Sequence, residues 1–464
     1  MNINHNILIR GGKLVGEGVD GCVHTPPLFS CKIDRYMNNK YVSKLQFHNI
    51  YSLNELNASN LIKLKYKNYY INHFSIILKQ CTKNLDEITD MSLFDKQTCT
   101  FFQNFEKYHN YNYNYKSNTL FSISIYKYIV GYPLKQFFDF NQTILLYENN
   151  TFQYFKQSIS NFFYLQKSIY MLYNINLVHN GLHYNNIVIN TYNNNLPVII
   201  DFGRSFKIDF NDENSYHNFF SYFNKFNFKP ERTWDSFDVR FIYYILKHKS
   251  FLLFYYNKSY NKTPNFLNKK YIDVFIDIII INDFKYYKYI SNNKFDFHKI
   301  IIMYKKFLQD FLYKFSDINS FPLIDDVVRN IYSNYIIYNI DSYSVIFNFL
   351  DFFLSNYHNL SKINNIYILN NIFIKYLFVN INPIIGYKFL YKNHFGFFKY
   401  IYKFFKSDEF YKNQNYLYFK KTMFQYFKNN NLNTHYFIEN DIFKSIYDYK
   451  IDFVSFFHSS SFYY

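Results

Sequence analysis

Two short polar segments, close together in the chain, constrain its fold more than any other feature. The first is His179–Asn186, with the sequence HNGLHYNN, and the second is the triplet Asp201–Gly203, fifteen residues further on. An Ile-Ile pair directly before the triplet is typical of a buried strand. A polar loop, a buried strand and an acidic triplet are typical of part of a functional site, and the other parts of such a site can come from distant segments of the chain.

The N-terminal part contains a glycine-rich octet. Gly16–Val23, with the sequence GEGVDGCV, follows a short apolar run. It fits a strand-turn-strand that closes over nucleotide phosphates, because missing side chains let backbone N–H groups approach the oxygens. A glycine-rich hairpin is more often only a tight turn, so the octet by itself does not establish nucleotide binding.

A lysine and a glutamate follow at a spacing that allows them to pair. Tyr41–Leu45 reads as the next strand of a small sheet and carries Lys44 near its end. Glu55 is the only acidic residue between Lys44 and Asp86, so it is the one candidate for a helix carboxylate that orients the lysine. A solvated surface glutamate is the alternative, and the gap between the two residues is somewhat short for such a pair.

The middle of the chain continues this order of elements. Phe121–Ile125 alternates apolar residues with serine, which predicts a strand, and Tyr126–Leu134 follows with a glycine and a proline. From Phe155 onward, apolar residues recur every three or four positions, which predicts a helix with one buried face leading into the polar loop. These positions are Ile159, Phe162, Leu165, Ile169 and Leu172.

In this order the motifs resemble those of the protein-kinase superfamily, and the chain is most similar in style to the serine/threonine-protein kinases of large nucleocytoplasmic DNA viruses. Gly16–Leu28 is the most lineage-specific piece. The resemblance implies an α+β, two-lobed kinase-like fold with a small antiparallel β-rich N-lobe, a mainly helical C-lobe, an insertion and a helical C-terminal extension. It also implies ATP and Mg²⁺ as cofactors, with Tyr126–Leu134 as a hinge that offers backbone groups to the adenine.

The resemblance assigns roles residue by residue. Lys44 would hold the α- and β-phosphates with Glu55 as its partner, and Asn186 and Asp201 would each bind a magnesium ion. The expected nucleotide contacts are Val15, Gly16, Gly18, Gly21, Val23 and Lys44. The expected catalytic set is Lys44, Glu55, Gly181, His183, Asn186 and Asp201.

Three positions of the polar loop depart from the family. Gly181 stands where kinases keep the proton-accepting aspartate, a group of a kind worth about 10²–10⁴ in rate. His183 stands where a lysine usually lies near the γ-phosphate, and a protonated imidazole would replace that charge. Asn180 replaces the usual arginine, so we do not expect control by a phosphorylated activation loop.

The C-terminal half allows two alignments. The central C-lobe helix opens at either Asp238 or Asp341, and we prefer Asp341 because Asn382-Pro383 follows it at the distance expected of a kinase Asp-Pro turn. An apolar helix face at Ile346, Phe349, Leu350, Phe353 and Leu354 follows Asp341 as well. The predicted domains are a kinase-like domain over 8–400, with an N-lobe over about 8–128, a C-lobe over about 132–400 and an insertion over about 240–335, and a basic, aromatic-rich extension over 401–464.

Composition excludes some classes of protein. The formal charge of +17 accompanies 58 phenylalanines and 53 tyrosines, an enrichment typical of an A/T-rich genome, and no nucleic-acid-binding motif is visible, so we do not expect nucleic acid as a partner. We expect no secretory signal and no membrane partner, hence a soluble intracellular protein, in the host cytoplasm or the virion if the chain is viral. Four cysteines show neither zinc-site spacing nor the density of a disulfide scaffold, which suits a reducing compartment.

Two functions follow from these features. The first is an ATP- and Mg-dependent protein kinase of serine/threonine type, weakened by Gly181. The second is a pseudokinase, which binds nucleotide and engages a protein without chemistry. The partner is accordingly a protein substrate or a partner kinase. No sequence motif indicates the oligomeric state or whether the acceptor residue is serine, threonine or tyrosine.

Overall fold

The computed structural model describes parts of both halves of the chain. The described residues are 13–18, 21–28, 38–84, 99–101, 119–144, 148–209, 273–274, 276–277, 305, 309, 337–356, 360, 364–381, 391–430, 442–451 and 454. They belong to two compact units. The first unit takes its residues from Met1–Leu134, His179–Gly181 and Asn185–Lys207, and the second from Lys135–Val178, Leu182–Tyr184 and Ile208–Tyr464.

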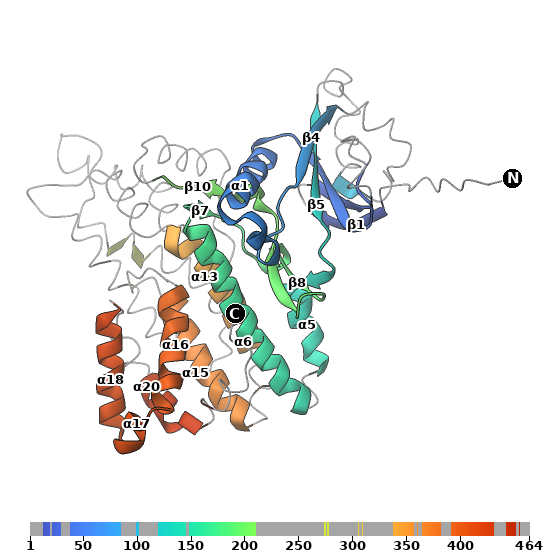
Figure 1. Cartoon of the computed structure of the whole chain (residues 1–464). Coiled ribbons are helices and arrows are strands. Elements are labelled where there is room, and N and C mark those ends of the chain that lie inside the picture. The colour runs from blue at the N-terminus through green and yellow to red at the C-terminus, as the bar shows by residue number, and fades with distance from the viewer. Residues whose placement is uncertain are drawn as a thin grey trace, which may run out of the picture. The chain divides into compact units, whose positions relative to one another are not determined.

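The first unit contains an antiparallel sheet of five strands (Figure 1). Its strands are β1 (Lys13–Gly18), β2 (Gly21–Thr25), β3 (Tyr41–Phe47), β4 (Lys79–Asn84) and β5 (Leu120–Lys127). They are hydrogen-bonded in the order β1-β2-β3-β5-β4, and every neighbouring pair is antiparallel. The glycine-rich hairpin and the two strands predicted after it are therefore confirmed, as is the α+β class with an antiparallel sheet.

The two faces of this sheet bury different side chains, because successive residues of a strand point to opposite sides. One face is apolar, with Leu45 of β3 opposite Ile123 of β5. The other face is polar, with Lys44 opposite Ser124. Ser122 and Ser124 of β5 are fully buried. The alternation of serine and apolar residues in β5 therefore does not mark one buried and one exposed face. Both faces are buried, one against apolar and the other against polar side chains.

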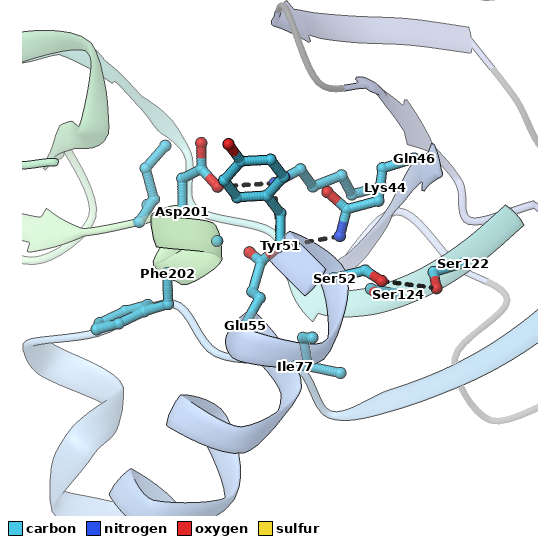
Figure 2. A network of polar contacts seen from close by, with 12 residues as sticks. Lys44, Gln46, Tyr51, Ser52, Glu55, Ile77, Ser122, Ser124, Asp201 and Phe202 are labelled. Atoms are coloured by element: carbon cyan, nitrogen blue, oxygen red, sulfur yellow. Dashed lines mark hydrogen bonds and ion pairs between the residues drawn. The ribbon is translucent and has the colours of Figure 1, made fainter. Parts of the chain in front are cut away.

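Helix α1 (Ile50–Tyr66) covers the polar face of the sheet. Asn49 caps the helix, because its side chain accepts hydrogen bonds from two backbone N–H groups of the first turn, and Ser52 completes the capping box. The buried positions recur every three or four residues; they are Ser52, Glu55, Ala58, Ser59 and Ile62. The Ser52 hydroxyl lies 3.3 Å from that of Ser122 (Figure 2). Helix α1 thus presents a polar stripe to the sheet.

A second sheet of the first unit connects the polar loop with the Asp201–Gly203 triplet. It contains β6 (Gly131–Pro133), β8 (Ile187–Asn190) and β9 (Leu196–Ile199), in the antiparallel order β6-β8-β9. A Cβ on Gly131 would lie 1.9 Å from the carbonyl oxygen of Ile189, so this close approach of two strands requires glycine. The β8–β9 hairpin starts after Asn186 and ends just before Asp201.

The second unit is helical. Its elements are α5 (Leu134–Ile144), α6 (Glu148–Tyr173), β7 (Leu177–Val178), α13 (Ile337–Ser355), α15 (Asn364–Ile381), α16 (Tyr391–Phe405), α17 (Asp408–Lys412), α18 (Tyr416–Asn429) and α20 (Ile442–Asp448). Short 3₁₀ turns and one further strand complete the described elements of the chain: η3 (Lys67–Asn72), η4 (Tyr184–Asn186), η5 (Phe202–Arg204) and β10 (Phe206–Lys207). Among the described helices, none combines the length and the apolar character needed to cross a bilayer.

Phenylalanine rings join the helices of the second unit. Phe162 of α6 lies edge-on to Phe349 of α13 and to Phe373 of α15, with ring centroids 5.4 Å apart in both pairs. Phe163 of α6 lies 5.6 Å from Phe398 of α16. Such pairs contribute about 0.5–1.5 kcal/mol beyond the burial of their area. The helix predicted from Phe155 onward is confirmed as α6, and its Phe162 and Phe163 rings contact three other helices.

Helix α13 is buried on all sides, although we expected a single apolar face. Every residue from 340 to 350 is buried, including Asp341. The helix begins at Ile337, so Asp341 lies one turn inside it rather than at its start. The Asn348 amide donates a hydrogen bond of 2.9 Å to the carbonyl oxygen of Leu182. A polar residue of α13 therefore holds the short loop segment that belongs to the second unit.

Several C-terminal predictions lie outside the described residues. These are Asp238, Asn382-Pro383 and almost all of the insertion over about 240–335. The proposed boundary between residues 400 and 401 falls inside α16. The residues on both sides of that boundary thus belong to one helix.

Candidate functional site

Lys44 is the centre of a polar cluster in the first unit. Strand β3 places it between Val23 of β2 and Ser124 of β5, on the polar face of the sheet. Its Nζ lies 3.1 Å from Glu55 Oε2 and 2.8 Å from Asp201 Oδ1 (Figure 2). One ammonium group thus pairs with two carboxylates, one from α1 and one from the triplet.

Glu55 is the lysine partner that the sequence predicted. It occupies the centre of the buried stripe of α1, and its side chain is only 2% exposed, which rules out the alternative of a solvated surface glutamate. Gln46, two residues after Lys44 on the same face of β3, donates a second hydrogen bond of 3.1 Å to Glu55 Oε2. Both donors compensate the cost of burying the carboxylate.

Asp201 is the second carboxylate partner of Lys44. Its backbone φ of 62° is in the left-handed region, which aspartate tolerates better than most residues. Its side chain is 37% exposed, so a carboxylate oxygen remains accessible to a ligand. Strain of this kind is concentrated at functional sites, where surrounding contacts hold the residue in place.

The charges of the cluster stabilise one another. Burial opposes the charge of Asp201, but Lys44 outweighs it and lowers the pKa of this carboxyl group to about 2. Burial likewise opposes the charge of Lys44, but Asp201 and Glu55 raise its pKa above the ordinary value. Burial, and next the charge of Glu55, raise the pKa of the Tyr126 hydroxyl. At neutral pH Lys44 is therefore an ammonium group, Asp201 a carboxylate and Tyr126 a neutral phenol.

Ring contacts and a backbone contact fix the triplet. Phe202 is fully buried between His179, whose ring centroid is 4.7 Å away, and Phe74 at 6.0 Å. The amide of Asn54, on α1, lies 3.4 Å from the carbonyl oxygen of Gly203. His179 Nε2 lies 2.9 Å from the carbonyl oxygen of the residue before Asp201. The first residue of the polar loop and helix α1 thus hold the triplet from two sides.

Asn186 lies beside Asp201 through the end of the β8–β9 hairpin. The Ile200 N–H donates to the carbonyl oxygen of Asn186 at 3.0 Å, which brings the two sequence positions together. The Asn186 side chain donates from Nδ2 to the carbonyl oxygen of Gly181 at 2.9 Å. This bond uses the amide nitrogen, so Oδ1 is the atom of Asn186 that can ligate a metal. An amide oxygen and an accessible carboxylate are hard ligands that fit Mg²⁺.

Gly181 leaves free space rather than a strained backbone. A Cβ built on it would lie 3.6 Å from His179 Nδ1, 3.7 Å from Asn186 Nδ2 and 3.7 Å from Arg204 Cδ, which are ordinary contact distances. The residue before it, Asn180, has the left-handed φ in this loop, at 54°. An aspartate at position 181 would therefore fit the backbone, and the glycine changes the chemistry of the site rather than its shape.

The glycines of the N-terminal hairpin have different reasons to be there. Gly18 and Gly21 are opposite each other at the end of the β1–β2 ladder. A Cβ on Gly21 would lie 2.2 Å from the carbonyl oxygen of Leu45, so close packing of β2 on β3 requires this glycine whatever it binds. A Cβ on Gly16 would meet only an ordinary contact of 3.8 Å with Val23. The two residues between Gly18 and Gly21 lie outside the described part.

Apolar side chains lie next to Lys44 on the same face of the sheet. Val23 packs against a buried group formed by Val42, Ile77 and Tyr126. Val15, the other predicted apolar contact of the nucleotide, is 40% exposed on β1. Val23 and Val42 lie on the lysine side of the sheet, because Val23 is opposite Lys44 and Val42 is two residues before it. An apolar surface thus adjoins the ion pairs, as a flat heterocyclic ring requires.

His183 belongs to a different compact unit from the other predicted catalytic residues. It is half-buried and belongs, with Leu182 and Tyr184, to the second unit, whereas the residues on both sides belong to the first. The other predicted catalytic residues, namely Lys44, Glu55, Gly181, Asn186 and Asp201, all belong to the first unit. The sequence prediction missed Gln46, Asn54 and Phe74. The period-2 position of Gln46 relative to Lys44 is the one signal that would have indicated it.

The cysteines correct one of our expectations. Cys22 of β2 and Cys99 form a disulfide across 77 residues of sequence, and Cys81 is disulfide-bonded as well. We expected thiols in a reducing compartment, but sequence spacing carries no information on which distant segments the fold brings together. Glu17 of β1 also accepts a hydrogen bond from the Phe101 N–H at 3.0 Å. The segment 99–101 is therefore attached to both strands of the glycine-rich hairpin.

Comparison with known proteins adds no family assignment. Neither the protein-family models nor the curated proteins include a match to this sequence. The resemblance to kinases therefore depends on the motifs and on the geometry of the cluster around Lys44.

Proposed function

We propose that the chain is an ATP- and Mg-dependent protein kinase of serine/threonine type, which transfers the γ-phosphate of ATP to protein hydroxyl groups at a slow rate. We further propose that its two compact units are the β-rich lobe and the helical lobe of a kinase-like fold. The five-stranded antiparallel sheet with one covering helix in the first unit, and the helices of the second, support this assignment. The partners are then protein substrates.

One observation carries the proposal: Lys44 pairs with Glu55 at 3.1 Å and with Asp201 at 2.8 Å. Protein kinases need an ion pair between a lysine of the third strand and a helix glutamate, together with the aspartate of the triplet, for phosphoryl transfer. Asp201 is separated from Lys44 by 157 residues. Lys44, Glu55 and Asp201 each lie in a motif of the expected type, so we do not expect the three to meet by chance. In this role Lys44 binds the α- and β-phosphates, and Glu55 keeps its ammonium group in place.

The residues that face the phosphates fit magnesium. Asn186 offers an amide oxygen and Asp201 an exposed carboxylate, and each would hold a magnesium ion. When bound, magnesium would supply positive charge that stabilises the phosphoryl group during transfer. Val23 and the apolar group behind it would contact the adenine, and the β1–β2 hairpin would cover the phosphates with backbone N–H groups.

Gly181 determines the expected rate. Without an aspartate at this position, no side chain of residue 181 orients the acceptor hydroxyl or removes its proton, which costs about 10²–10⁴ in rate. Most of the acceleration in phosphoryl transfer comes from positioning and electrostatic stabilisation, which Lys44, Asn186 and Asp201 supply. Slow transfer is therefore the expected behaviour.

The alternative function is that of a pseudokinase, a nucleotide-binding module that regulates a partner protein. Gly181 is the observation that favours it, since the loop is otherwise ordered around a position without a functional group. The two functions differ in chemistry and not in nucleotide binding. Affinity for ATP therefore does not distinguish them.

Transfer of labelled γ-phosphate from Mg·ATP distinguishes the two functions. The natural protein, Asp201→Asn and Gly181→Asp are compared, with a generic protein acceptor and with the chain itself as acceptors. Asp408→Asn is the matched control, because it makes the same acid-to-amide change at an exposed residue of α17. A kinase gives transfer that is lost in Asp201→Asn and kept in the control.

The remaining outcomes also have definite meanings. A natural protein without transfer, together with transfer by Gly181→Asp, identifies a pseudokinase on a competent site. Absence of nucleotide binding in the natural protein and in both variants refutes both functions. Transfer that is unchanged in Asp201→Asn refutes the assignment of the site.

A further inference from the structure

Arg204 lies beside the position that Gly181 leaves empty. It is the last residue of the η5 turn, three residues after Asp201. Its Cδ is one of the three atoms nearest to a Cβ built on Gly181, at 3.7 Å, and Asn186 Nδ2 is another at the same distance. The arginine side chain therefore passes next to the residues that would hold the magnesium ion and the transferred phosphate.

The charge of Arg204 is not used within the described part of the chain. Lys44 is already paired with two carboxylates, whereas the guanidinium of Arg204 has no ion pair or hydrogen bond among the described residues. Arg204 is half-buried. A half-buried guanidinium that lies outside the ion pairs of Lys44 can bind an anionic ligand with two N–H donors.

The choice of arginine at this position is informative. Arginine occurs at six positions of this chain, whereas lysine supplies nearly all of its basic residues. Guanidinium differs from ammonium in its planar fork of N–H donors, which binds two oxygens of one phosphate at once. A position that keeps arginine in so lysine-rich a chain is therefore a candidate for phosphate recognition.

An aspartate at position 181 would change this charge balance. Its carboxylate would begin within contact distance of the arginine stem and would form an ion pair with the guanidinium. With glycine there, Arg204 keeps its charge available to a ligand. We infer that Arg204 binds the terminal phosphate of the bound nucleotide, and that Gly181 is the residue that leaves it free to do so.

This inference deepens the proposed function and depends on it. The same substitution that removes the proton acceptor supplies a second cation at the phosphate, in a site where Lys44 is already neutralised. Additional charge at the transferred group stabilises it both when bound and during transfer. With glycine at position 181 the site lacks a proton acceptor but has an additional positive charge, whose contribution to the rate is smaller.

Equilibrium binding of Mg·ATP and Mg·ADP to the full chain tests the inference, because only ATP carries the terminal phosphate. Arg204→Met removes the charge and keeps an unbranched stem, whereas Arg204→Lys keeps the charge and loses the fork. Lys207→Met is the matched control, since it removes an exposed positive charge from the same segment. Thermal unfolding of each variant verifies that it is folded.

The expected result is a loss of about tenfold in affinity for Mg·ATP in Arg204→Met, with affinity for Mg·ADP within about twofold of the natural value. Arg204→Lys is expected to lie between the two, and Lys207→Met is expected to match the natural protein. Gly181→Asp is expected to weaken Mg·ATP to a similar extent, and Gly181→Asp with Arg204→Met is expected to be no weaker than either alone. Faster phosphate transfer by Gly181→Asp agrees with this expectation. A proton acceptor raises the transfer rate by about 10²–10⁴, which exceeds a tenfold loss of affinity for Mg·ATP.

Two results overturn the inference. If Arg204→Met changes the affinities for both nucleotides equally, or changes neither, Arg204 does not read the terminal phosphate, although the proposed function stands. If the natural protein binds neither nucleotide, the proposed function fails and the inference fails with it. The nucleotide affinities of the natural protein thus separate the two failures.

Discussion

The interiors of the two units are built from different side chains. In the first unit, helix α1 and the sheet bury serines, a glutamine and an ion pair on one face of the sheet. In the second unit, helices α6, α13, α15 and α16 bury mainly phenylalanine and other apolar residues. Apolar burial stabilises without fixing charge, whereas a buried polar network is costly unless every member is satisfied. The described interior of the first unit therefore contains a charged network beside an apolar core, whereas aromatic and aliphatic side chains dominate that of the second.

The largest effect that follows from this contrast is on the aromatic core. Phe162→Ala is expected to lower the free energy of unfolding by about 4 kcal/mol, because it removes a fully buried ring that contacts two other helices. Urea denaturation followed by circular dichroism measures it. Tyr411→Ala, at a residue 64% exposed, is the control and is expected to cost less than about 0.5 kcal/mol. An equal cost in both variants would contradict the assigned core.

Removal of the Cys22–Cys99 disulfide is expected to give the next largest loss of stability, and this loss is confined to the first unit. All four cysteines precede residue 100. Replacing Cys22 and Cys99 by serine is expected to lower the free energy of unfolding of the first unit by about 3 kcal/mol, since a long loop is no longer closed in the unfolded chain. Hydrogen exchange measures each unit separately. Equal loss of protection in α6 and in the sheet would show that the two units do not differ in this respect.

The buried ion pair gives a smaller effect. Glu55→Gln keeps the shape of the side chain but removes one of the two carboxylates of Lys44, and we expect a cost of about 2 kcal/mol because both groups are largely buried. Thermal unfolding at pH 7 measures this cost. Glu409→Gln, at an exposed residue of α17, is the comparison and is expected to lie within about 0.5 kcal/mol of the natural protein. A cost no larger than that of the control would mean that Glu55 is not buried as a charged group.

The smallest effect concerns pH. The pKa of Asp201 is about 2 in the folded protein and 3.8 ordinarily, so its contribution to stability is complete above the ordinary value and is lost as pH falls from about 4 to 2. Solvent screens part of this effect, because the side chain is 37% exposed. Unfolding of the natural protein and of Asp201→Asn is therefore expected to differ at pH 5 and to converge near pH 2. A difference that is constant over this range would exclude a lowered pKa.

Local patterns of the sequence predicted a large part of the first unit. The alternating segment Phe121–Ile125 and the segment with Lys44 form strands as expected, and the described residues on both sides of the glycine-rich turn pair as expected. The pairing of Lys44 with Glu55 was also predictable, because only one acidic residue is available over that stretch. In the second unit, the period of α6 was correct, but α13 is buried all round and no amphipathic pattern reports that.

The sequence by itself determined which residue types are present and which short segments form strands or helices, because period and spacing act between near neighbours in the chain. Only the tertiary structure decided that Asp201 contacts Lys44 across 157 residues, that Cys22 bonds to Cys99, and that Arg204 lies beside Gly181. These contacts depend on strand register and on the path of the chain between elements. Both are set by packing of the whole unit rather than by any local pattern.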